Sequence, residues 1–228
     1  MQRPEPLTTG VHAVHEDADL LVLAKPAGLL CVPGRGPDKQ DCLSARAQLR
    51  WPGALIVHRL DQATSGLVLM ARHVQAQRQL SHAFAERQVH KRYVAVVQGQ
   101  LGGGAATAEG DGSAPWNDIH LPIAADWARR PLRVVDPATG KPSHTRWRAM
   151  GYDDNADTTR VELEPITGRT HQLRVHMAAT GHPILGDALY AETATQARSP
   201  RLLLHAAELA LVNPATGEPM RWVLAADF

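Results

Sequence analysis

This sequence has few cysteines and lacks the common nucleotide-binding motifs. Only Cys31 and Cys42 occur among 228 residues, and no Cys-x-x-Cys motif is present. A zinc ribbon and a dithiol redox motif are therefore excluded, and two reduced thiols are expected. The Gly-x-Gly-x-x-Gly and Walker A patterns are absent as well. Nothing in the sequence therefore supports a nucleotide cofactor.

An excess of charge and long apolar runs are also lacking. The 24 Lys and Arg residues nearly balance the 23 Asp and Glu residues, which leaves a net charge of +1 at pH 7. Any surface that binds nucleic acid must therefore arise from local basic clusters. The longest early apolar run, residues 20–24, is far shorter than the roughly 20 residues of a membrane span. Because the N-terminus also lacks the apolar core of a signal peptide, we expect a cytoplasmic protein without membrane attachment.

Short apolar runs predict strands, and one amphipathic stretch predicts a helix. Strand-like runs lie at residues 20–24, 55–57, 67–70, 91–99, 144–150, 159–166 and 201–212. Between residues 74 and 87, Ala76, Leu80 and Phe84 recur at helical spacing. The segment 102–115 is rich in glycine and alanine. It fits either a surface loop or a divider between two lobes, and the unchanged composition after it favours the loop.

One short sequence, Pro-Ala-Thr-Gly-x-Pro, occurs twice. The copies lie at residues 137–142 and 214–219, each between strand-like runs. Proline and glycine at these positions are typical of turns. Both copies therefore predict hairpin turns rather than a repeat architecture.

A polar segment between two apolar runs, HRLDQATSG, concentrates reactive groups. Its polar side chains are His58, Arg59, Asp61, Thr64 and Ser65. Asp61 fits either a rigidly held reagent or a turn residue that makes local backbone bonds. A metal site is disfavoured because no second carboxylate lies nearby, and a phosphotransferase would need an acidic residue where the chain has Ala63. Ser65 and Gly66 are expected to close the loop.

A second informative segment is PITGRTHQLRVHMAATGHP, at residues 165–183. Thr170 is a plausible N-cap of a short helix, and Leu173 and Met177 share one face of it. Arg169 would then lie beside the free N–H groups at the helix N-terminus, which favours anion binding. Arg174 lies further along the same helix. The histidines of this segment fall on different helix faces, so local hydrogen bonds are favoured over zinc.

Arginines cluster locally despite the balanced total charge. The clusters comprise Arg129, Arg130, Arg133, Arg146 and Arg148, with Trp147 between the last two. Each cluster alone fits an ordinary solvated surface. Together with Arg169 and Arg174 they predict a groove that binds phosphates, because arginine pairs with phosphate bidentately and tryptophan can stack on bases.

Several motifs follow one another in order along the chain. LAKPAGLL precedes HRLDQATSGL, KRYVAVV follows, and GRTHQLRVHM with HPILGD comes later. In this order they resemble the RluA family of pseudouridine synthases over nearly the whole chain. The resemblance implies an α/β fold with a curved, mixed and mostly antiparallel sheet, flanking helices and a central catalytic cleft. We expect a single catalytic domain over residues 1–228, without an S4 RNA-binding domain.

The resemblance also implies the catalytic residues. Asp61 matches the essential aspartate of the family. Tyr93 matches the tyrosine that stacks on the target base and is implicated in removing a proton from C5. Arg169 matches the basic residue that pairs with the aspartate. Whether Asp61 attacks the sugar or removes its C2′ proton stays open.

The remaining matches concern the substrate. Arg59 matches an arginine that enters the helical stack when the target nucleotide leaves, and His58, Thr64 and Arg174 are expected to bind substrate with it. The reaction needs neither cofactor nor metal, and a monomer is expected.

The resemblance is strongest to the short members of the family, and it implies two RNA targets. These are position 32 in the anticodon stem-loop of tRNA and a hairpin of 23S rRNA. A different target uridine within the family is the first alternative. A non-catalytic RNA-binding protein on the same fold is the second, because the basic clusters would serve it equally well.

Overall fold

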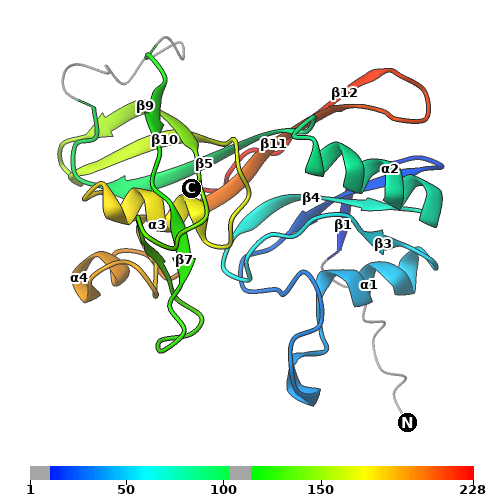
Figure 1. Cartoon of the computed structure of the whole chain (residues 1–228), viewed down its shortest axis with the longest axis horizontal. Helices are drawn as coiled ribbons and strands as arrows, with labels where there is room; N and C mark the ends of the chain where they lie inside the picture. The colour runs from blue at the N-terminus through cyan, green and yellow to red at the C-terminus, as the bar shows by residue number, and fades with distance from the viewer. Residues whose placement is uncertain (1–10, 103–113) are drawn as a thin grey trace. The chain divides into compact units, whose positions relative to one another are not determined.

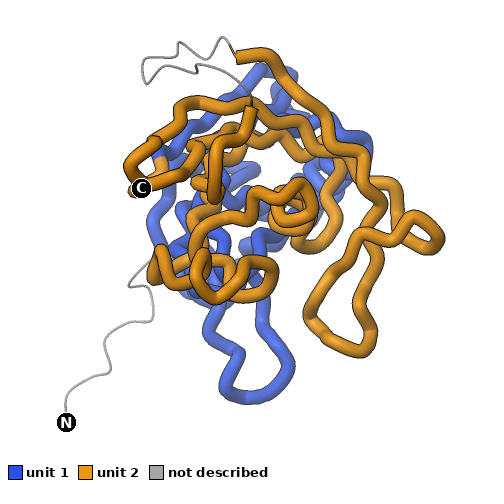
Figure 2. The backbone as a smooth tube through the Cα atoms, turned by 90° about the vertical axis from the view of Figure 1, so that its left-hand side faces the viewer, with its two compact units in different colours: residues 1–90, 206–225 blue, residues 91–205, 226–228 orange. Residues whose placement is uncertain are grey.

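The computed structural model describes residues 11–102 and 114–228. Most of the glycine-rich segment 102–115 lies outside the described residues. The chain divides into two compact units (Figure 2): unit 1 comprises residues 1–90 and 206–225, and unit 2 comprises residues 91–205 and 226–228. The expectation of a single catalytic domain stays a prediction.

Unit 1 consists of one set of neighbouring strands and two α-helices (Figure 1). Its strands are β1 (His12–Glu16), β2 (Leu20–Lys25), β3 (Leu55–Ile56), β4 (Ser65–Ala71), β11 (Leu204–Val212) and β12 (Pro219–Val223). Its helices are η1 (Pro37–Lys39), α1 (Leu43–Arg50) and α2 (Val74–Ala85). The strand order is β1-β2-β4-β11, with β3 also paired to β4 and β12 to β11. Two residues of β11, Leu204 and His205, belong to unit 2.

The core of unit 1 forms around β4, in which all seven residues are buried. Leu67 and Leu69 of β4 pack with Leu80 of α2, and Leu209 of β11 joins the same cluster. Complete burial of such a leucine contributes about 1.5–3 kcal/mol. The predicted helix is confirmed within two residues. Its N-cap is His73, whose ring nitrogen accepts a hydrogen bond from the Ala76 amide.

Ser65 and Gly66 differ from the sequence expectation, because they begin β4 rather than close a loop. Gly66 has a φ of 116°, a conformation that side chains rarely adopt. A Cβ atom at this position would lie 2.3 Å from the carbonyl oxygen of Ala206. Only glycine therefore allows the backbones of β4 and β11 to approach this closely.

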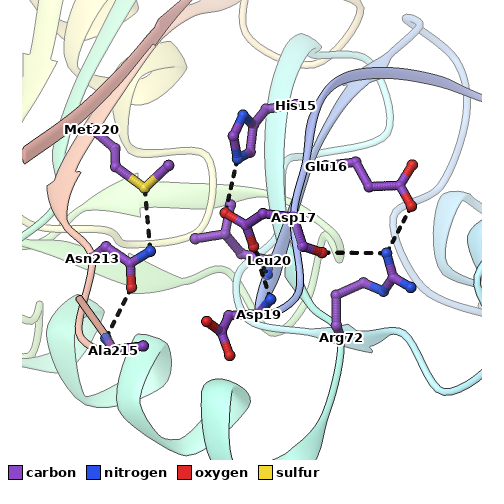
Figure 3. A network of polar contacts seen from close by, with 9 residues as sticks. All are labelled: His15, Glu16, Asp17, Asp19, Leu20, Arg72, Asn213, Ala215 and Met220. Carbon is purple, nitrogen blue, oxygen red and sulfur yellow. Dashed lines mark hydrogen bonds and ion pairs between the residues drawn. The ribbon is translucent and has the colours of Figure 1, made fainter. Parts of the chain in front are cut away.

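A network of polar contacts stabilises the turn between β1 and β2 (Figure 3). The Asp17 carboxylate accepts hydrogen bonds from the amides of Asp19 and Leu20, both at 2.8 Å, and pairs with the His15 ring at 2.9 Å. Arg72, just after β4, donates to Glu16 at 2.7 Å. Burial alone would raise the pKa of Asp17, but these hydrogen bonds outweigh it and lower the pKa.

Unit 2 has a second set of antiparallel strands. They are β5 (His90–Gln98), whose first residue belongs to unit 1, β6 (Asn117–Ile119), β7 (Ile123–Ala125), β8 (Arg133–Val135), β9 (Thr145–Asp153) and β10 (Thr158–Pro165). The order is β5-β10-β9-β6, and β7 pairs with β8 separately. The helices are α3 (Gln172–Ala179), which contacts β9 and β10, and α4 (Thr193–Gln196).

These elements confirm the predicted α/β class with mostly antiparallel strand pairing and flanking helices. The predicted central cleft stays a prediction. Of the two predicted hairpin turns, residues 214–219 join the paired strands β11 and β12. Residues 137–142 form a turn between β8 and β9, but β8 pairs with β7 instead. Within the described ranges, no helix is long and apolar enough to cross a membrane.

Candidate active site

The Asp61 loop connects β3 to β4 in unit 1, and contacts from residues 25–31 hold it. The Leu60 amide donates to the Cys31 sulfur at 3.2 Å, and the Gly28 amide donates to the Gln62 carbonyl at 2.8 Å. The Thr64 amide closes a turn onto the Asp61 carbonyl at 3.1 Å. Asp61 itself is half-buried. Its backbone is therefore fixed on both sides, as a positioned reactive carboxylate requires.

Lys25 is the cation that lies behind this loop. Its side chain is only 2% exposed, and its ammonium group donates to the carbonyl oxygens of Pro26, Leu29 and Gln62 at 2.8–3.0 Å. Burial lowers the pKa of Lys25 to about 8, while the nearby Asp61 carboxylate acts in the opposite direction. Lys25 is therefore a cationic neighbour of Asp61 within the same unit.

No motif in the sequence points to Lys25 as a neighbour of Asp61. A signal was nevertheless present in LAKPAGLL, where a lysine ends a fully apolar strand without a nearby acidic residue. A lysine in such a place must find its partners elsewhere, because an unpaired buried ammonium group is strongly unfavourable. Its partners here are backbone carbonyls, which a search for paired side-chain charges does not find.

The lowered pKa of Lys25 predicts a specific pH dependence of stability. The folded pKa of about 8 lies below the ordinary value of 10.5, so the unfolded chain binds more protons between these values. The contribution of Lys25 to the free energy of unfolding should therefore rise with pH in this window, at up to about 1.4 kcal/mol per pH unit. Urea unfolding of the unchanged chain and of Lys25→Met between pH 7.5 and 10 measures it.

The free energy of unfolding of the unchanged chain minus that of Lys25→Met should increase with pH. The exposed control variant, Lys39→Met, should show the same pH dependence as the unchanged chain. A pH-independent difference for Lys25→Met would contradict the buried, shifted ammonium group.

The other predicted residues of unit 1 take different positions. Arg59 is exposed, as a residue that reaches into RNA must be. The His58 ring accepts a hydrogen bond from the Leu69 amide at 2.9 Å and stacks on Phe84 with ring centroids 4.5 Å apart. Thr64 is 2% exposed. These contacts give His58 and Thr64 a part in shaping the loop, and their contact with substrate stays a prediction.

In unit 2, Tyr93 lies in β5 and is half-buried. The register pairs it with Leu163 of β10, and Leu163 pairs in turn with Trp147 of β9. Paired residues of antiparallel strands point to the same face of a sheet. Tyr93 therefore shares a face with Trp147, whereas Arg146 and Arg148 point to the opposite face.

Arg169 is exposed in the loop before α3. Its amide donates to the Gln172 side-chain oxygen at 3.0 Å, and its guanidinium group donates to the Pro142 carbonyl at 3.3 and 3.4 Å. The predicted N-cap at Thr170 is wrong by one residue. The N-cap is His171, which adopts a left-handed conformation with a φ of 58° and makes no side-chain capping bond.

His144 organises this loop through its backbone. Its amide donates to the Thr167 hydroxyl, and its carbonyl accepts from the Ile166 and Thr167 amides and from the Gln172 side chain. Gln172 also accepts a hydrogen bond from the Thr167 hydroxyl at 2.7 Å. Arg169 therefore emerges from a loop whose position depends on the residue just before β9.

Arg174 is 4% exposed and forms two hydrogen bonds with Asp187, at 2.8 and 2.5 Å. Asp187 is 1% exposed and also accepts from the amides of Leu189 and Tyr190. This bidentate pair gives Arg174 a role in the core of unit 2. Its predicted contact with substrate stays a prediction.

Two of the clustered arginines, Arg146 and Arg148, share an aromatic partner with Arg92. The guanidinium carbons of all three are 4.8–5.1 Å from the ring centroid of Trp116. These arginines also pair with the carboxylates of β10, Glu162 and Glu164. The predicted groove of phosphate-binding arginines stays a prediction.

The candidate residues are therefore divided between the units. His58, Arg59, Asp61 and Thr64 belong to unit 1, whereas Tyr93, Arg169 and Arg174 belong to unit 2. Each unit holds its own residues in a defined local geometry. That Asp61 meets Tyr93 and Arg169 in one active site stays a prediction from the family resemblance.

Comparison with known proteins places this loop and fold in one family. The family model described as RNA pseudouridylate synthase matches residues 19–179. The dual-specificity RNA pseudouridine synthase RluA of Yersinia pestis is 44% identical over 215 residues, covering 94% of this chain and 98% of that protein. The protein of the same name from Escherichia coli strain K12 is 45% identical, with coverages of 94% and 93%.

Solved structures agree with this placement. The human RNA pseudouridylate synthase domain containing 1 protein has a TM-score of 0.76 and 28% identity, and the match covers all of this chain and 87% of that one. The domain containing 4 protein has a TM-score of 0.70 and 25% identity, with coverages of 96% and 89%. The chain therefore belongs to the RNA pseudouridylate synthase family. It is an RNA pseudouridine synthase, an isomerase that acts on uridine in RNA.

Proposed function

We propose that this enzyme modifies two kinds of structured RNA, the anticodon stem-loop of tRNA at position 32 and a hairpin of 23S rRNA. The observation that carries the proposal is the 40–45% identity to relatives named dual-specificity synthases, over 94–98% of this chain. Recognition of a compact stem-loop suits a protein that reads local RNA shape rather than a long duplex. We also propose that it acts as a monomer in the cytoplasm.

The chemistry defines what Asp61 must do. The N1–C1′ bond breaks, the uracil turns and C5 bonds to C1′. The proton on C5 then leaves and N1 takes up a proton, so the product is an isomer of the substrate. In one route the Asp61 carboxylate attacks C1′ and is later displaced by C5. In the other route Asp61 removes the C2′ proton, which gives a glycal, and the proton returns after the new bond forms. Both routes need an ionised carboxylate shielded from water, since hydrolysis would release the base.

Two cations support the ionised form of Asp61 in this proposal. Lys25 acts from behind the loop in unit 1, where its charge and that of Asp61 attract one another. Arg169 would act from unit 2, where it is exposed in a loop that hydrogen bonds hold in place. An opposite charge near a carboxylate favours its ionised form by direct attraction.

The base is handled by two further residues in the proposal. Tyr93 offers a flat ring against which uracil can stack, with a hydroxyl group near the reacting ring. Arg59 is exposed and can fill the space that the flipped nucleotide leaves, which offsets part of the unstacking cost of a few kcal/mol. Every step uses groups of this chain and of the RNA.

Mapping of pseudouridine in total RNA tests the proposal. Carbodiimide modification reveals each pseudouridine as a stop in reverse transcription, so a strain lacking the gene is compared with one that carries it. We expect the gene-dependent signals to be one tRNA anticodon-stem-loop position and one 23S rRNA hairpin position. Gene-dependent signals elsewhere would show a different specificity within the family. Identical maps would favour a non-catalytic RNA-binding role.

A further inference from the structure

Three potential metal ligands gather in unit 2, where β6 meets β9. They are Asp118, His120 and His144. Asp118 and His120 are two residues apart on an extended segment and so point to the same side. The register pairs Ile119 with Thr145, which places His120 opposite His144. The two imidazole rings are stacked, with centroids 4.1 Å apart, and the His144 Nε2 atom lies 2.5 Å from an Asp118 oxygen.

We propose that these three residues bind one zinc ion. Each offers one ligand atom, and the three atoms all lie within 4.8 Å of one another. Zinc bonds of about 2.0–2.1 Å in a tetrahedron place ligand atoms roughly 3.3 Å apart. The widest pair must therefore close by at most about 1.5 Å, and the His144–Asp118 pair, now at 2.5 Å, must open by about 0.8 Å. Asp118 and His120 are exposed, which leaves their side chains room to do so.

The donor set excludes the hard divalent ions, because magnesium and calcium prefer sites made of oxygen atoms. Two imidazoles and one carboxylate suit zinc and also iron(II), and zinc is the ion that a site needing no redox chemistry takes most simply. The ion would replace the proton that His144 and Asp118 now share in their hydrogen bond. Arg146 pairs with Asp118 in the strand register, but its guanidinium group donates a hydrogen bond to Glu164 at 2.9 Å. Its positive charge therefore has a carboxylate partner other than Asp118. Water would fill the fourth position, as it does in three-ligand zinc sites.

A fourth histidine lies close by but has a different role. His176 is fully buried, and its two ring nitrogens lie 2.9 Å from the Thr145 hydroxyl and from the Leu121 carbonyl. Both nitrogens are therefore occupied inside unit 2. The zinc site consists of the three residues at the surface, and His176 packs beneath them.

A zinc ion at this site would connect β6 to the loop that carries Arg169. β6 has only three residues, and it is the last strand in the order of its sheet. A zinc ion would tie it to His144, whose backbone accepts and donates the hydrogen bonds that hold residues 166–172. Zinc should therefore slow the opening of this loop. The importance of that effect for catalysis rests on the proposed role of Arg169.

Zinc binding to the purified full-length chain tests the site directly. The metal-free protein is titrated with zinc in a competing chelator, and calorimetry gives the stoichiometry and affinity. We expect one zinc ion per chain, and a loss of at least about tenfold in affinity for His120→Ala and for Asp118→Asn. His82→Ala, which removes an exposed histidine of α2, should bind as the unchanged chain does. Absent binding, or equal affinity in all four proteins, would overturn the proposal.

Hydrogen exchange tests the link to the loop. The amides of Ile166 and Thr167 donate to the His144 carbonyl, so zinc should slow their exchange in the unchanged chain and not in His120→Ala. Zinc binding without slower exchange would overturn the link. Neither measurement uses RNA, so failure here leaves the proposed RNA targets untouched, and a wrong assignment of RNA targets leaves the zinc site untouched.

Discussion

Asp61→Asn is expected to lower the rate of pseudouridine formation by on the order of 10³-fold, with RNA binding largely retained. The amide has nearly the same shape as the carboxylate, so the contacts of Cys31, Gly28 and Thr64 with the loop backbone should persist. What is lost is the negative charge that either attacks C1′ or removes the C2′ proton. Single-turnover assays with a tRNA stem-loop, together with filter binding of the same RNA, measure the two effects separately.

A matched variant controls for the loss of one negative charge. Asp38→Asn changes an exposed residue of η1 in the same unit and should leave the rate near that of the unchanged chain. A similar loss of rate in both variants would mean that charge at a distance matters, not the position of Asp61. Full activity of Asp61→Asn would remove the basis for the catalytic assignment.

Asp187→Ala is expected to destabilise the protein by about 3–5 kcal/mol. The variant leaves the guanidinium group of Arg174 buried without its carboxylate and also removes the acceptor for the amides of Leu189 and Tyr190. Chemical unfolding followed by circular dichroism measures the loss. Because α3 carries Arg174 and follows the Arg169 loop, local opening should appear there first in hydrogen exchange.

Two further proteins separate charge from packing at this pair. Asp154→Ala removes an exposed aspartate of the same unit and should change the free energy of unfolding by less than about 0.5 kcal/mol. The double variant Arg174→Met with Asp187→Leu removes both charges and should recover much of the lost stability. If the double variant were as unstable as Asp187→Ala, the unpaired charge would not be the cause.

The secondary structure was predictable wherever one local pattern dominated. The apolar run at residues 67–70 lies within the fully buried β4, and the helical spacing of Ala76 and Leu80 lies within α2. Burial can be predicted from such local patterns alone, because a continuous apolar run has no solvent-facing side. Family membership was also predictable, since the HRLDQATSG segment and its companion motifs are long and ordered.

The details that failed depend on residues distant in sequence. Gly66 begins β4 because of its close approach to Ala206, which no local pattern shows. The turn at residues 137–142 connects β8 to β9, but these strands are not paired with each other, because β8 pairs with β7.

The candidate site shows the same division. Asp61 and Arg169 were predicted as site residues from the motifs, whereas the contacts that hold their loops were not predicted. Lys25 supports the Asp61 loop through the carbonyl of Gln62, 37 residues away, and His144 supports the Arg169 loop across 22 to 28 residues. Hydrogen bonds to backbone atoms leave no pattern of side-chain types in a sequence.

The order of synthesis has a consequence for unit 1. Its first ninety residues leave the ribosome long before residues 206–225, which complete the same unit. Until then β4 lacks its neighbour β11, and the apolar cluster lacks Leu209, Leu211 and Trp222. An apolar strand with one unpaired edge readily associates with other chains. The nascent enzyme should therefore need shielding until its last strands emerge, and a chain shortened by its final twenty-five residues should aggregate rather than fold.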